Sequence, residues 1–353
     1  MQTEPPNADP PKRKSRWFQF SLRTLLIFTV ICAIAAGRLG SKIEQKRNEC
    51  EAVEAIVKSG GAVYYDYQRE EPGTLNGNGP GWRLNNLEPI GPAWLRKLLG
   101  ENFFSEVDAI AFDNSSVTDA DLVSLKGLTH VHVLTLWSRN ITDAGLLNLR
   151  GLTELQRLDV NGTQVTDAGM VNLNGLTKLQ VLILEGTNVT DAGLDNFKLM
   201  SQLQIVYLGE TNVADAGLVK LKSLTALQDL GLSRTKITDA GLAHLKGLSQ
   251  LRRLDLSVTA VGDAGLVNLK GLTALQDLEL DRTQVADGGL VNLLGMTQLQ
   301  SLNLWKDSKI SNAGLVDLKR LPQLRQLDLI DTTVTDAGAD DLRTALPNCK
   351  ISH

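Results

Sequence analysis

A stretch of 24 residues recurs along most of this 353-residue chain, and no other feature restricts its possible folds as strongly. The repeated pattern is LxxLxLxxTxVTDAGLxxLxxLTx, and an aliphatic residue stands at its first position. These first positions are Val131, Leu155, Leu179, Leu203, Leu227, Leu251, Leu275 and Leu299. An earlier, degenerate unit begins near Val107 and a final one at Leu324, which gives about ten units. A fixed period of this length predicts a solenoid, in which each unit packs only against its neighbours.

The repeated unit is predicted to contain a strand followed by a short helix. In residues 155–160, inward Leu158 and Val160 alternate with outward Arg157 and Asp159, as a strand with one buried face requires. The Ala-Gly pair of each unit allows close packing where the helix begins. Residues at a spacing of three then bury the helix against the strands. In this unit they are Met170, Leu173 and Leu176.

The unit resembles the leucine-rich-repeat family, whose signature LxxLxLxxN/C it matches except for threonine at the ninth position. These threonines are Thr163, Thr187, Thr211, Thr235, Thr259, Thr283 and Thr332. Their hydroxyl groups can hydrogen-bond the turn backbone, and Thr166 or Asp167 can accept amide protons where a helix begins. The V-T-D-A-G-L run is similar to F-box-associated and ribonuclease-inhibitor-like repeats and their bacterial relatives, but no F-box segment is visible. The resemblance implies an α/β fold, a right-handed solenoid with a parallel strand ladder on its concave face and helices on its convex face.

An apolar segment near the N-terminus predicts engagement with a membrane. Residues 25–36 read LLIFTVICAIAA and follow a tail rich in proline and basic residues. A membrane-spanning helix needs about 20 residues, and extension of this segment back to Trp17 gives a predicted span over residues 17–37. Arg23 would then reach toward the basic side of the membrane. Residues 1–16 are predicted to be a disordered cytoplasmic tail, because basic segments favour the cytoplasmic side.

A cleaved signal peptide is the alternative interpretation of this segment. The run Ala33-Ile34-Ala35 provides small residues at signal-peptidase spacing. The basic leader is long for a signal peptide, however, and Arg38 and Lys42 follow the apolar residues closely. The sequence therefore favours a single-pass signal anchor with the repeats outside the cytoplasm, whereas cleavage would give a secreted or periplasmic protein.

Residues 38–102 are predicted to form a linker helix and an N-terminal cap. Apolar residues among charges predict a helix over 41–58, ended by Gly60 and Gly61, and then a strand over 62–67. Residues 68–89 are rich in Gly, Asn and Pro and predict a loop, after which Pro92 favours a helix start. The repeats are assigned to residues 103–346, and residues 347–353 are expected to cap the far end.

Charge and cysteine content narrow the classes of partner. Residues 103–346 carry 29 acidic and 21 basic side chains, so the repeats are expected to bind neutral or basic partners. The net charge of −4 gives no support to nucleic-acid binding. The three cysteines lie far apart, which predicts no disulfide framework and no zinc site. No cofactor is expected.

The third, fifth and seventh positions of each unit are predicted to face the concave side, where they can contact a partner. Units two, four and five place an apolar and aromatic stripe there, and unit three interrupts it with Arg157 and Asp159. The residues of the stripe are Val133, Trp137, Val181, Ile183, Ile205 and Tyr207. Exposed apolar side chains that a core does not use indicate an interaction surface.

Units six to nine present a different set of concave side chains. Asp229, Arg253 and Asp277 alternate in sign at one position, which predicts a ladder of ion pairs. An excess of negative charge remains at Asp255, Glu279 and Asp281. In unit nine an inserted residue follows Trp305, which shares the column of Trp137 and is predicted to anchor an interface.

Together these features predict a membrane-anchored protein that binds another protein through its concave face. A component of the cell envelope that assembles with copies of itself is the alternative. An enzyme that uses Asp255 and Glu279 in acid–base chemistry is the third hypothesis, but the predicted sheet is open and no nucleophile motif or phosphate loop occurs. His130 and His132 lack the cysteine or carboxylate pattern of a metal site.

Overall fold

The structure is a computed structural model that describes residues 22–68, 88–113 and 116–353. The predicted tail over 1–16, the first residues of the predicted membrane span and most of the predicted loop over 68–89 lie outside the described residues. The chain divides into two compact units, Met1–Asn48 and Glu49–His353. The two units are described separately.

Helix α1 runs through Leu22–Lys58 without a break. The sequence suggested an apolar helix to residue 37 and a further helix from residue 41, and the structure joins the two. Gly37 and Gly40 lie inside α1, where each glycine costs about 1 kcal/mol relative to alanine. Within the described residues, α1 is the helix that is long and apolar enough to cross a membrane. This candidate span is Leu25–Lys58, with a mean hydropathy of 1.7 in its most apolar window and none of that window buried.

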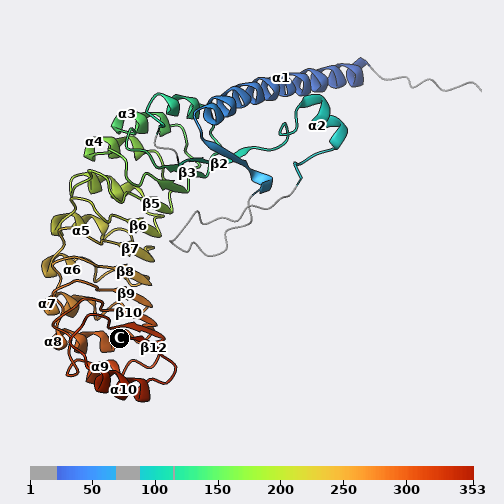
Figure 1. The fold of residues 1–353 in the computed structure, drawn as a ribbon. Coiled ribbons are helices and arrows are strands. Elements are labelled where there is room, and N and C mark those ends of the chain that lie inside the picture. The colour runs from blue at the N-terminus through green and yellow to red at the C-terminus, as the bar shows by residue number, and fades with distance from the viewer. Residues whose placement is uncertain (1–21, 69–87, 114–115) are drawn as a thin grey trace, which may run out of the picture. The chain divides into compact units, whose positions relative to one another are not determined.

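Among the described residues, twelve strands form one sheet whose spatial order follows the sequence. Figure 1 shows them stacked along one side of the second unit. The strands are β1 (Ala62–Tyr65), β2 (Val107–Phe112), β3 (Val133–Leu136), β4 (Arg157–Asp159), β5 (Val181–Ile183), β6 (Ile205–Tyr207), β7 (Asp229–Gly231), β8 (Arg253–Asp255), β9 (Asp277–Glu279), β10 (Ser301–Asn303), β11 (Gln326–Asp328) and β12 (Lys350–Ser352). Strands β2 to β12 pair in parallel, and Leu158 pairs with Leu182, which pairs with Val206 on its other side. The register confirms the repeat predicted from the sequence.

Both ends of the ladder carry an added strand. Strand β1 pairs antiparallel with β2, and the predicted strand over 62–67 ends at Tyr65, where the 3₁₀ turn η1 (Asp66–Gln68) begins. Helix α2 (Ala93–Leu99) has Pro92 at its cap, as the sequence predicted. At the other end, β12 pairs in parallel with β11, so the segment expected to cap the array extends its sheet by one strand.

Short helices and 3₁₀ turns lie on the opposite side of the second unit from the strands (Figure 1). The α-helices are α3 (Asp143–Leu146), α4 (Asp167–Met170), α5 (Asp215–Leu221), α6 (Asp239–Leu242), α7 (Asp263–Leu266), α8 (Asp287–Leu290), α9 (Leu315–Leu318) and α10 (Asp336–Ala345). The 3₁₀ turns are η2 (Asp121–Leu125), η3 (Leu147–Leu149), η4 (Val171–Leu173), η5 (Gly193–Leu199), η6 (Val267–Leu269) and η7 (Val291–Gly295). Met170, Leu173 and Leu176 have no exposed surface, which confirms the predicted inward stripe of the helix.

The Thr-Asp-Ala-Gly motif links neighbouring repeats, a role that the sequence did not reveal. The carboxylate of Asp167 accepts hydrogen bonds from the backbone N–H of Thr190 at 2.7 Å, from its hydroxyl at 2.6 Å and from the N–H of Gly193 at 3.0 Å. A Cβ added to Gly193 would lie 2.6 Å from Asp167 Oδ1, so the glycine leaves room for the aspartate of the preceding unit. Thr166 caps its own helix by accepting from the N–H of Ala168, as predicted.

The eighth position has a left-handed backbone conformation in the units from Leu155 onward. Two units have glycine there, Gly162 and Gly186, while later units have larger residues with φ between 54° and 61°. These are Glu210, Arg234, Val258, Arg282, Lys306 and Asp331. The left-handed region favours glycine, and a β-branched residue such as Val258 is strained there.

Unit nine replaces the ninth-position threonine with Asp307. In six other units the threonine hydroxyl donates to a carbonyl of its own turn, as Thr163 does to Val160 O at 2.7 Å. Asp307 is instead buried, and its carboxylate accepts from the backbone N–H of Thr283 at 2.8 Å. The inserted residue therefore accompanies a change of turn chemistry, from a hydroxyl donor to a carboxylate acceptor that reaches the preceding unit.

Candidate functional site

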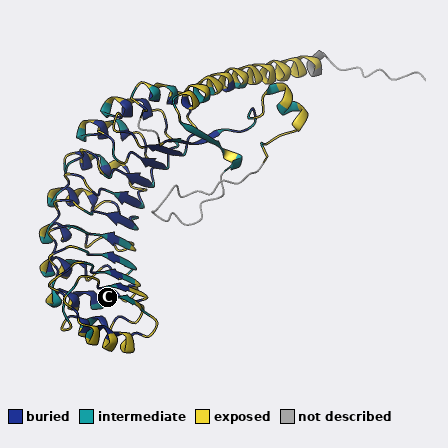
Figure 2. Cartoon of the chain, viewed as in Figure 1, coloured by how far each residue is buried: buried dark blue, intermediate teal, exposed yellow. Residues whose placement is uncertain are grey.

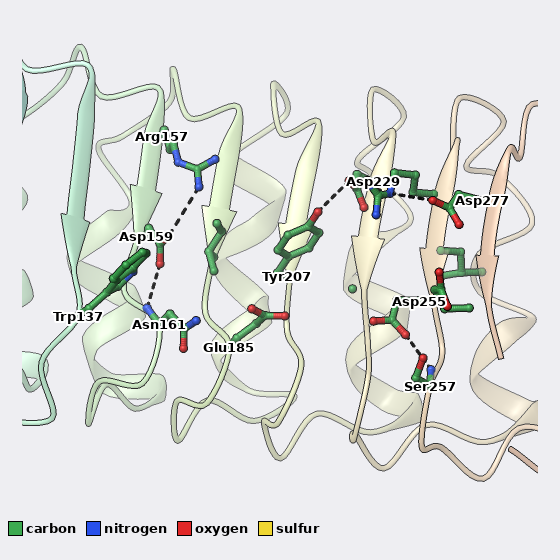
Figure 3. Close-up of a pocket in the computed structure, with 15 residues that line it drawn as sticks. Trp137, Arg157, Asp159, Asn161, Glu185, Tyr207, Asp229, Asp255, Ser257 and Asp277 are labelled. Atoms are coloured by element: carbon green, nitrogen blue, oxygen red, sulfur yellow. Dashed lines mark hydrogen bonds and ion pairs between the residues drawn. The ribbon is translucent and has the colours of Figure 1, made fainter. Parts of the chain in front are cut away.

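The strand side of the second unit contains a groove of about 420 Å³ (Figure 3). Side chains from the strands and following turns of seven successive units line it, from β3 to β9. The lining residues are Trp137, Arg157, Asp159, Asn161, Ile183, Glu185, Tyr207, Asp229, Gly231, Arg253, Leu254, Asp255, Ser257, Asp277 and Glu279. Sequence positions three, five and seven supply all of them except Leu254, so the predicted assignment of concave positions holds in this region.

The predicted apolar stripe is mostly covered. Val181, Ile183 and Ile205 are 1%, 4% and 3% exposed, because they pack against one another and against the half-buried Tyr207. Val133 is buried as well. Val181, Ile183, Ile205 and Tyr207 therefore cover one another, although the sequence interpreted them as unused surface. The narrow spacing of neighbouring strands, about 4.8 Å, lets β-branched side chains on a shared face close over each other.

Trp137 remains open to solvent at the N-terminal end of the groove. Its side chain is 44% exposed and stands beside Asp159 and Asn161 in Figure 3. Trp305, predicted as a second anchor in the same column, lies outside the groove. Arg282 and Lys306 stack over the Trp305 ring at 4.4 and 4.3 Å from its centroid. Two cation–π contacts thus occupy this ring, while the Trp137 ring remains exposed.

Arg157 and Asp159 lie deep in the groove. They are 6% and 3% exposed, and Arg157 Nη2 lies 3.6 Å from Asp159 Oδ2. Burial raises the pKa of Asp159 above its ordinary value, although hydrogen bonds from Trp137 and Asn161 and the charge of Arg157 act in the opposite direction. The desolvation of both charges therefore costs more free energy than their attraction at 3.6 Å provides.

Tyr207 and the predicted ion-pair ladder follow along the groove. Arg253 Nε lies 3.7 Å from Asp229 Oδ2 and 3.5 Å from Asp277 Oδ2, which confirms the ladder. The Tyr207 hydroxyl donates to Asp229 at 2.9 Å. Gly231 makes room for the Tyr207 ring, because an added Cβ would lie 2.9 Å from Tyr207 Cδ1. One arginine therefore serves two carboxylates of the groove.

The groove carries an excess of negative charge. Its lining includes six carboxylates and two guanidinium groups. Burial, followed by repulsion from Asp277, Asp255 and Asp281, raises the pKa of Glu279 to about 7. Burial and neighbouring carboxylates likewise raise the pKa of Glu185. Carboxylates that hold their protons this strongly are short of positive partners within the protein.

The sequence missed four residues of the groove, Glu185, Gly231, Leu254 and Ser257, and predicted five concave contacts that do not line it, including the buried Val133, Val181 and Ile205. Glu185 was overlooked because its unit was read for Val181 and Ile183, although its seventh position marks it as concave. Gly231 was overlooked because a missing side chain carries no chemistry by itself. Asp281 and Trp305, both predicted as concave contacts, are not among the residues that line the groove.

The groove holds both carboxylates that the sequence singled out for acid–base chemistry. Asp255 and Glu279 stand on neighbouring strands, and Asp255 accepts a hydrogen bond from the N–H of Ser257 at 2.8 Å. Within residues 22–68, 88–113 and 116–353, no group of three His, Cys, Asp or Glu side chains is placed to hold a metal ion. His132 Nδ1 instead lies 2.7 Å from Asp108 Oδ1.

The parallel ladder, the leucine core and the helical outer side define a leucine-rich-repeat solenoid with an N-terminal helix. Comparison agrees, because residues 152–173 match the family model described as Leucine Rich repeat. Similar solved structures include internalin C2 of Listeria monocytogenes, with 26% identity over 62% of this chain and 84% of the internalin chain, at a TM-score of 0.45. They also include the internalin inlF of the same organism, with 20% identity over 73% of this chain and 92% of that chain, at a TM-score of 0.39. No curated protein matches the chain.

Proposed function

We propose that this protein is a binding scaffold that holds a protein partner on its strand side. The observation that carries the proposal is the groove, whose carboxylates outnumber its guanidinium groups by four. The scaffold needs none of these carboxylates for its core, and the raised pKa values of Glu185 and Glu279 indicate that they destabilise the free protein. Groups kept at such a cost are typical of binding sites.

The residues predicted from the sequence divide into three roles under this proposal. Trp137 and Tyr207 provide aromatic contact surface, and Val133, Val181, Ile183 and Ile205 form the floor that holds them in place. Arg157, Asp159, Asp255 and Glu279 provide polar contacts. Asp281 and Trp305 do not line the groove and would contact only a partner larger than the groove.

The test of this proposal is partner capture with two variants of equal net charge. The full chain, solubilised in detergent, is used as bait beside Asp255→Asn/Glu279→Gln and beside Glu154→Gln/Asp195→Asn. The second variant removes two exposed carboxylates that do not line the groove and pair with Lys178 and Lys220. We expect the same protein to be retained by the parent chain and the second variant and lost by the first. Equal retention by all three would place the partner elsewhere on the molecule.

We further infer that α1 anchors the protein in a membrane, with the basic tail over 1–16 in the cytoplasm, the span over 17–37 and the repeats outside. The length and apolar composition of α1 and the basic residues before it support this topology. Protease added to intact cells should digest the repeats, and the membrane fraction should retain the protein at alkaline pH. A mature N-terminus after residue 35 would instead establish the cleaved form.

Self-assembly is the second candidate function, and a row of aliphatic side chains on the helical side favours it. The residues recur at one repeat position and are 41% to 61% exposed. They are Val123, Leu147, Val171, Val219, Val267, Val291 and Val316. Sedimentation of the parent chain and of Val171→Lys/Val267→Lys tests this candidate, because an assembly through this row would be lost in the variant.

A further inference from the structure

Two side-chain atoms in the groove are buried without a hydrogen-bond partner. One is Arg157 Nε, a donor on β4, and the other is Asp277 Oδ1, an acceptor on β9. Arg157 is 6% exposed as a whole, so its guanidinium is nine-tenths buried while one of its N–H groups stays unused. An unmade hydrogen bond of a charged, buried group destabilises the protein, because the group has lost its water without gaining another partner. The free protein therefore presents an unsatisfied donor at one end of the groove and an unsatisfied acceptor at the other.

The distance between these ends fixes the length of a matching ligand. Strands β4 and β9 are separated by five steps of the sheet, or about 24 Å at a strand spacing of about 4.8 Å. An extended polypeptide rises about 3.3 Å per residue, so about seven residues cover this distance. Tyr207 lies in the middle, and Glu185 and Asp255 lie nearer the turns that follow the strands (Figure 3). Glu279 lies two residues beyond Asp277 on β9.

We propose that the groove binds an extended, basic polypeptide segment of the partner, about seven residues long, that lies across the strands from Arg157 to Asp277. A main-chain carbonyl or a carboxylate of the segment accepts from Arg157 Nε. Lysine or arginine side chains of the segment donate to Asp277 Oδ1 and pair with Glu185, Asp255 and Glu279. This inference rests on the proposed function and names the chemistry of the partner.

The electrostatics of the groove support a basic segment over a neutral one. Burial and mutual repulsion raise the pKa of Glu279 to about 7 and raise the pKa of Glu185 and Asp229. A bound cation would stabilise the charged forms of all three. A segment is required because a compact cation could satisfy the acidic end but would leave Arg157 without an acceptor.

The test uses defined peptide mixtures and the full chain in non-ionic detergent. The probe is a fluorescein-labelled mixture of nine-residue peptides with Lys or Arg at alternate positions and Ala, Ser, Gly or Leu between them. Its control is the same mixture with Asp or Glu at the alternate positions. Fluorescence anisotropy at about 100 mM salt, where exposed charges are screened beyond about 10 Å, measures the binding.

We expect the basic mixture to bind with a Kd of about 50 µM and the acidic mixture not to bind. The Asp255→Asn/Glu279→Gln variant should weaken the basic mixture about tenfold, while Glu154→Gln/Asp195→Asn should leave it within about twofold. Both double variants keep the shape of each side chain, and Glu185→Gln gives an independent third reading if either unfolds. Equal binding of the two mixtures, or equal binding by the two double variants, would overturn the proposal.

Two further arms separate this inference from its alternatives. Spermine that competes as well as the basic mixture, compared at equal charge, would show that the groove attracts any cation, and the polypeptide proposal would fall. A partner captured through the groove that contains no basic segment would leave the proposed function standing and overturn this inference alone. In the opposite outcome, basic peptides bind the groove while partner capture is unaffected by Asp255→Asn/Glu279→Gln. That result would overturn the proposed function of the groove and leave its preference for basic peptides standing.

Discussion

The two halves of the strand ladder share one backbone and differ in what covers their concave side. In β4 and β5 every residue is buried, whereas in β8, β9 and β10 the outer two residues of each strand are half-exposed around a buried leucine (Figure 2). The register does not change between them. The difference comes from side chains alone, because β5 and β6 present Val181, Ile183 and Ile205, while β8 and β9 present charges.

This comparison shows how a solenoid separates stability from recognition. The leucine ladder and the Asp–Thr links between repeats run through both halves and hold the shape. In the N-terminal half a second, small apolar cluster of Val181, Ile183 and Ile205 covers part of the concave side. In the C-terminal half Arg253 is shared by Asp229 and Asp277, while Asp255 and Glu279 stay half-exposed, so negative charge is in excess there.

The largest effect on stability should come from placing a carboxylate in the apolar cluster of the N-terminal half and an aliphatic side chain among the carboxylates of the C-terminal half. Ile183→Asp buries a carboxylate between Val181 and Ile205 and should lower the free energy of unfolding by about 3 kcal/mol. Asp255→Ile removes one of several repelling carboxylates at the cost of the bond to Ser257, and should change stability by less than about 1 kcal/mol. Denaturant unfolding followed by circular dichroism measures both. Equal losses would show that the two halves are equally intolerant of the wrong side chain.

The links between repeats should differ in strength between the halves. Asp167, in the N-terminal half, accepts three hydrogen bonds from the next unit, whereas Asp263 accepts one, from the N–H of Ala286 at 2.7 Å. We expect Asp167→Ala to cost about 2 kcal/mol and Asp263→Ala about 1 kcal/mol. The same unfolding measurement gives both values, and a reversed order would contradict this account of the motif.

The pH dependence of stability should originate in the C-terminal half. The pKa of Glu279 is raised from 4.5 in the unfolded chain to about 7 in the folded protein. The folded state therefore holds a proton that the unfolded chain has released, so stability falls as pH rises toward 7 and levels off above it. The charged groups that face Glu279, or stand close enough to influence it, are Asp255, Asp277, Asp281 and Arg253, and the amide of Asn303 also contacts it.

We expect the free energy of unfolding to be higher at pH 6 than at pH 8, and Glu279→Gln to remove about 1 kcal/mol of that difference. This value is set below the full equivalent of the shift because Glu279 is partly exposed. Asp307, whose pKa burial also raises to about 7, should supply the part that remains. Ile183→Val should leave the pH dependence unchanged, and an unchanged profile in Glu279→Gln would contradict the electrostatic account of the groove.

The smallest effect should come from the eighth position, where the two halves differ in backbone strain. Gly186 in the N-terminal half and Val258 in the C-terminal half have φ of 63° and 57°. Val258→Gly should stabilise the protein by about 0.5 kcal/mol, and Gly186→Val should destabilise it by about 1 kcal/mol. Thermal unfolding of both variants checks the signs, and a loss of stability in Val258→Gly would show that packing of the valine outweighs its strain.

Much of the fold could be predicted from the sequence because it depends on a local pattern. The register of Leu158, Leu182 and Val206 follows from the 24-residue period, and the buried helix stripe follows from the spacing of Met170, Leu173 and Leu176. The ion-pair ladder of Asp229, Arg253 and Asp277 could be predicted for the same reason, since equal positions in adjacent repeats meet on the sheet. The candidate site was predicted in outline only. The burial of Ile183 and Ile205 could not be predicted, because it depends on how side chains of neighbouring repeats pack against one another.

The sequence by itself determined that this chain is a solenoid, which side chains face its strand side and that an apolar helix precedes it, because each follows from spacing or composition along the chain. Only the tertiary structure decided which of those side chains remain accessible. It placed Trp305 between two cations while leaving Trp137 open, and it brought Glu185 and Glu279 into one groove with Arg157, whose Nε has no hydrogen-bond partner. Accessibility, pKa and unmet hydrogen bonds depend on neighbours from other repeats, and the geometry that joins those neighbours exists only once the repeats have stacked.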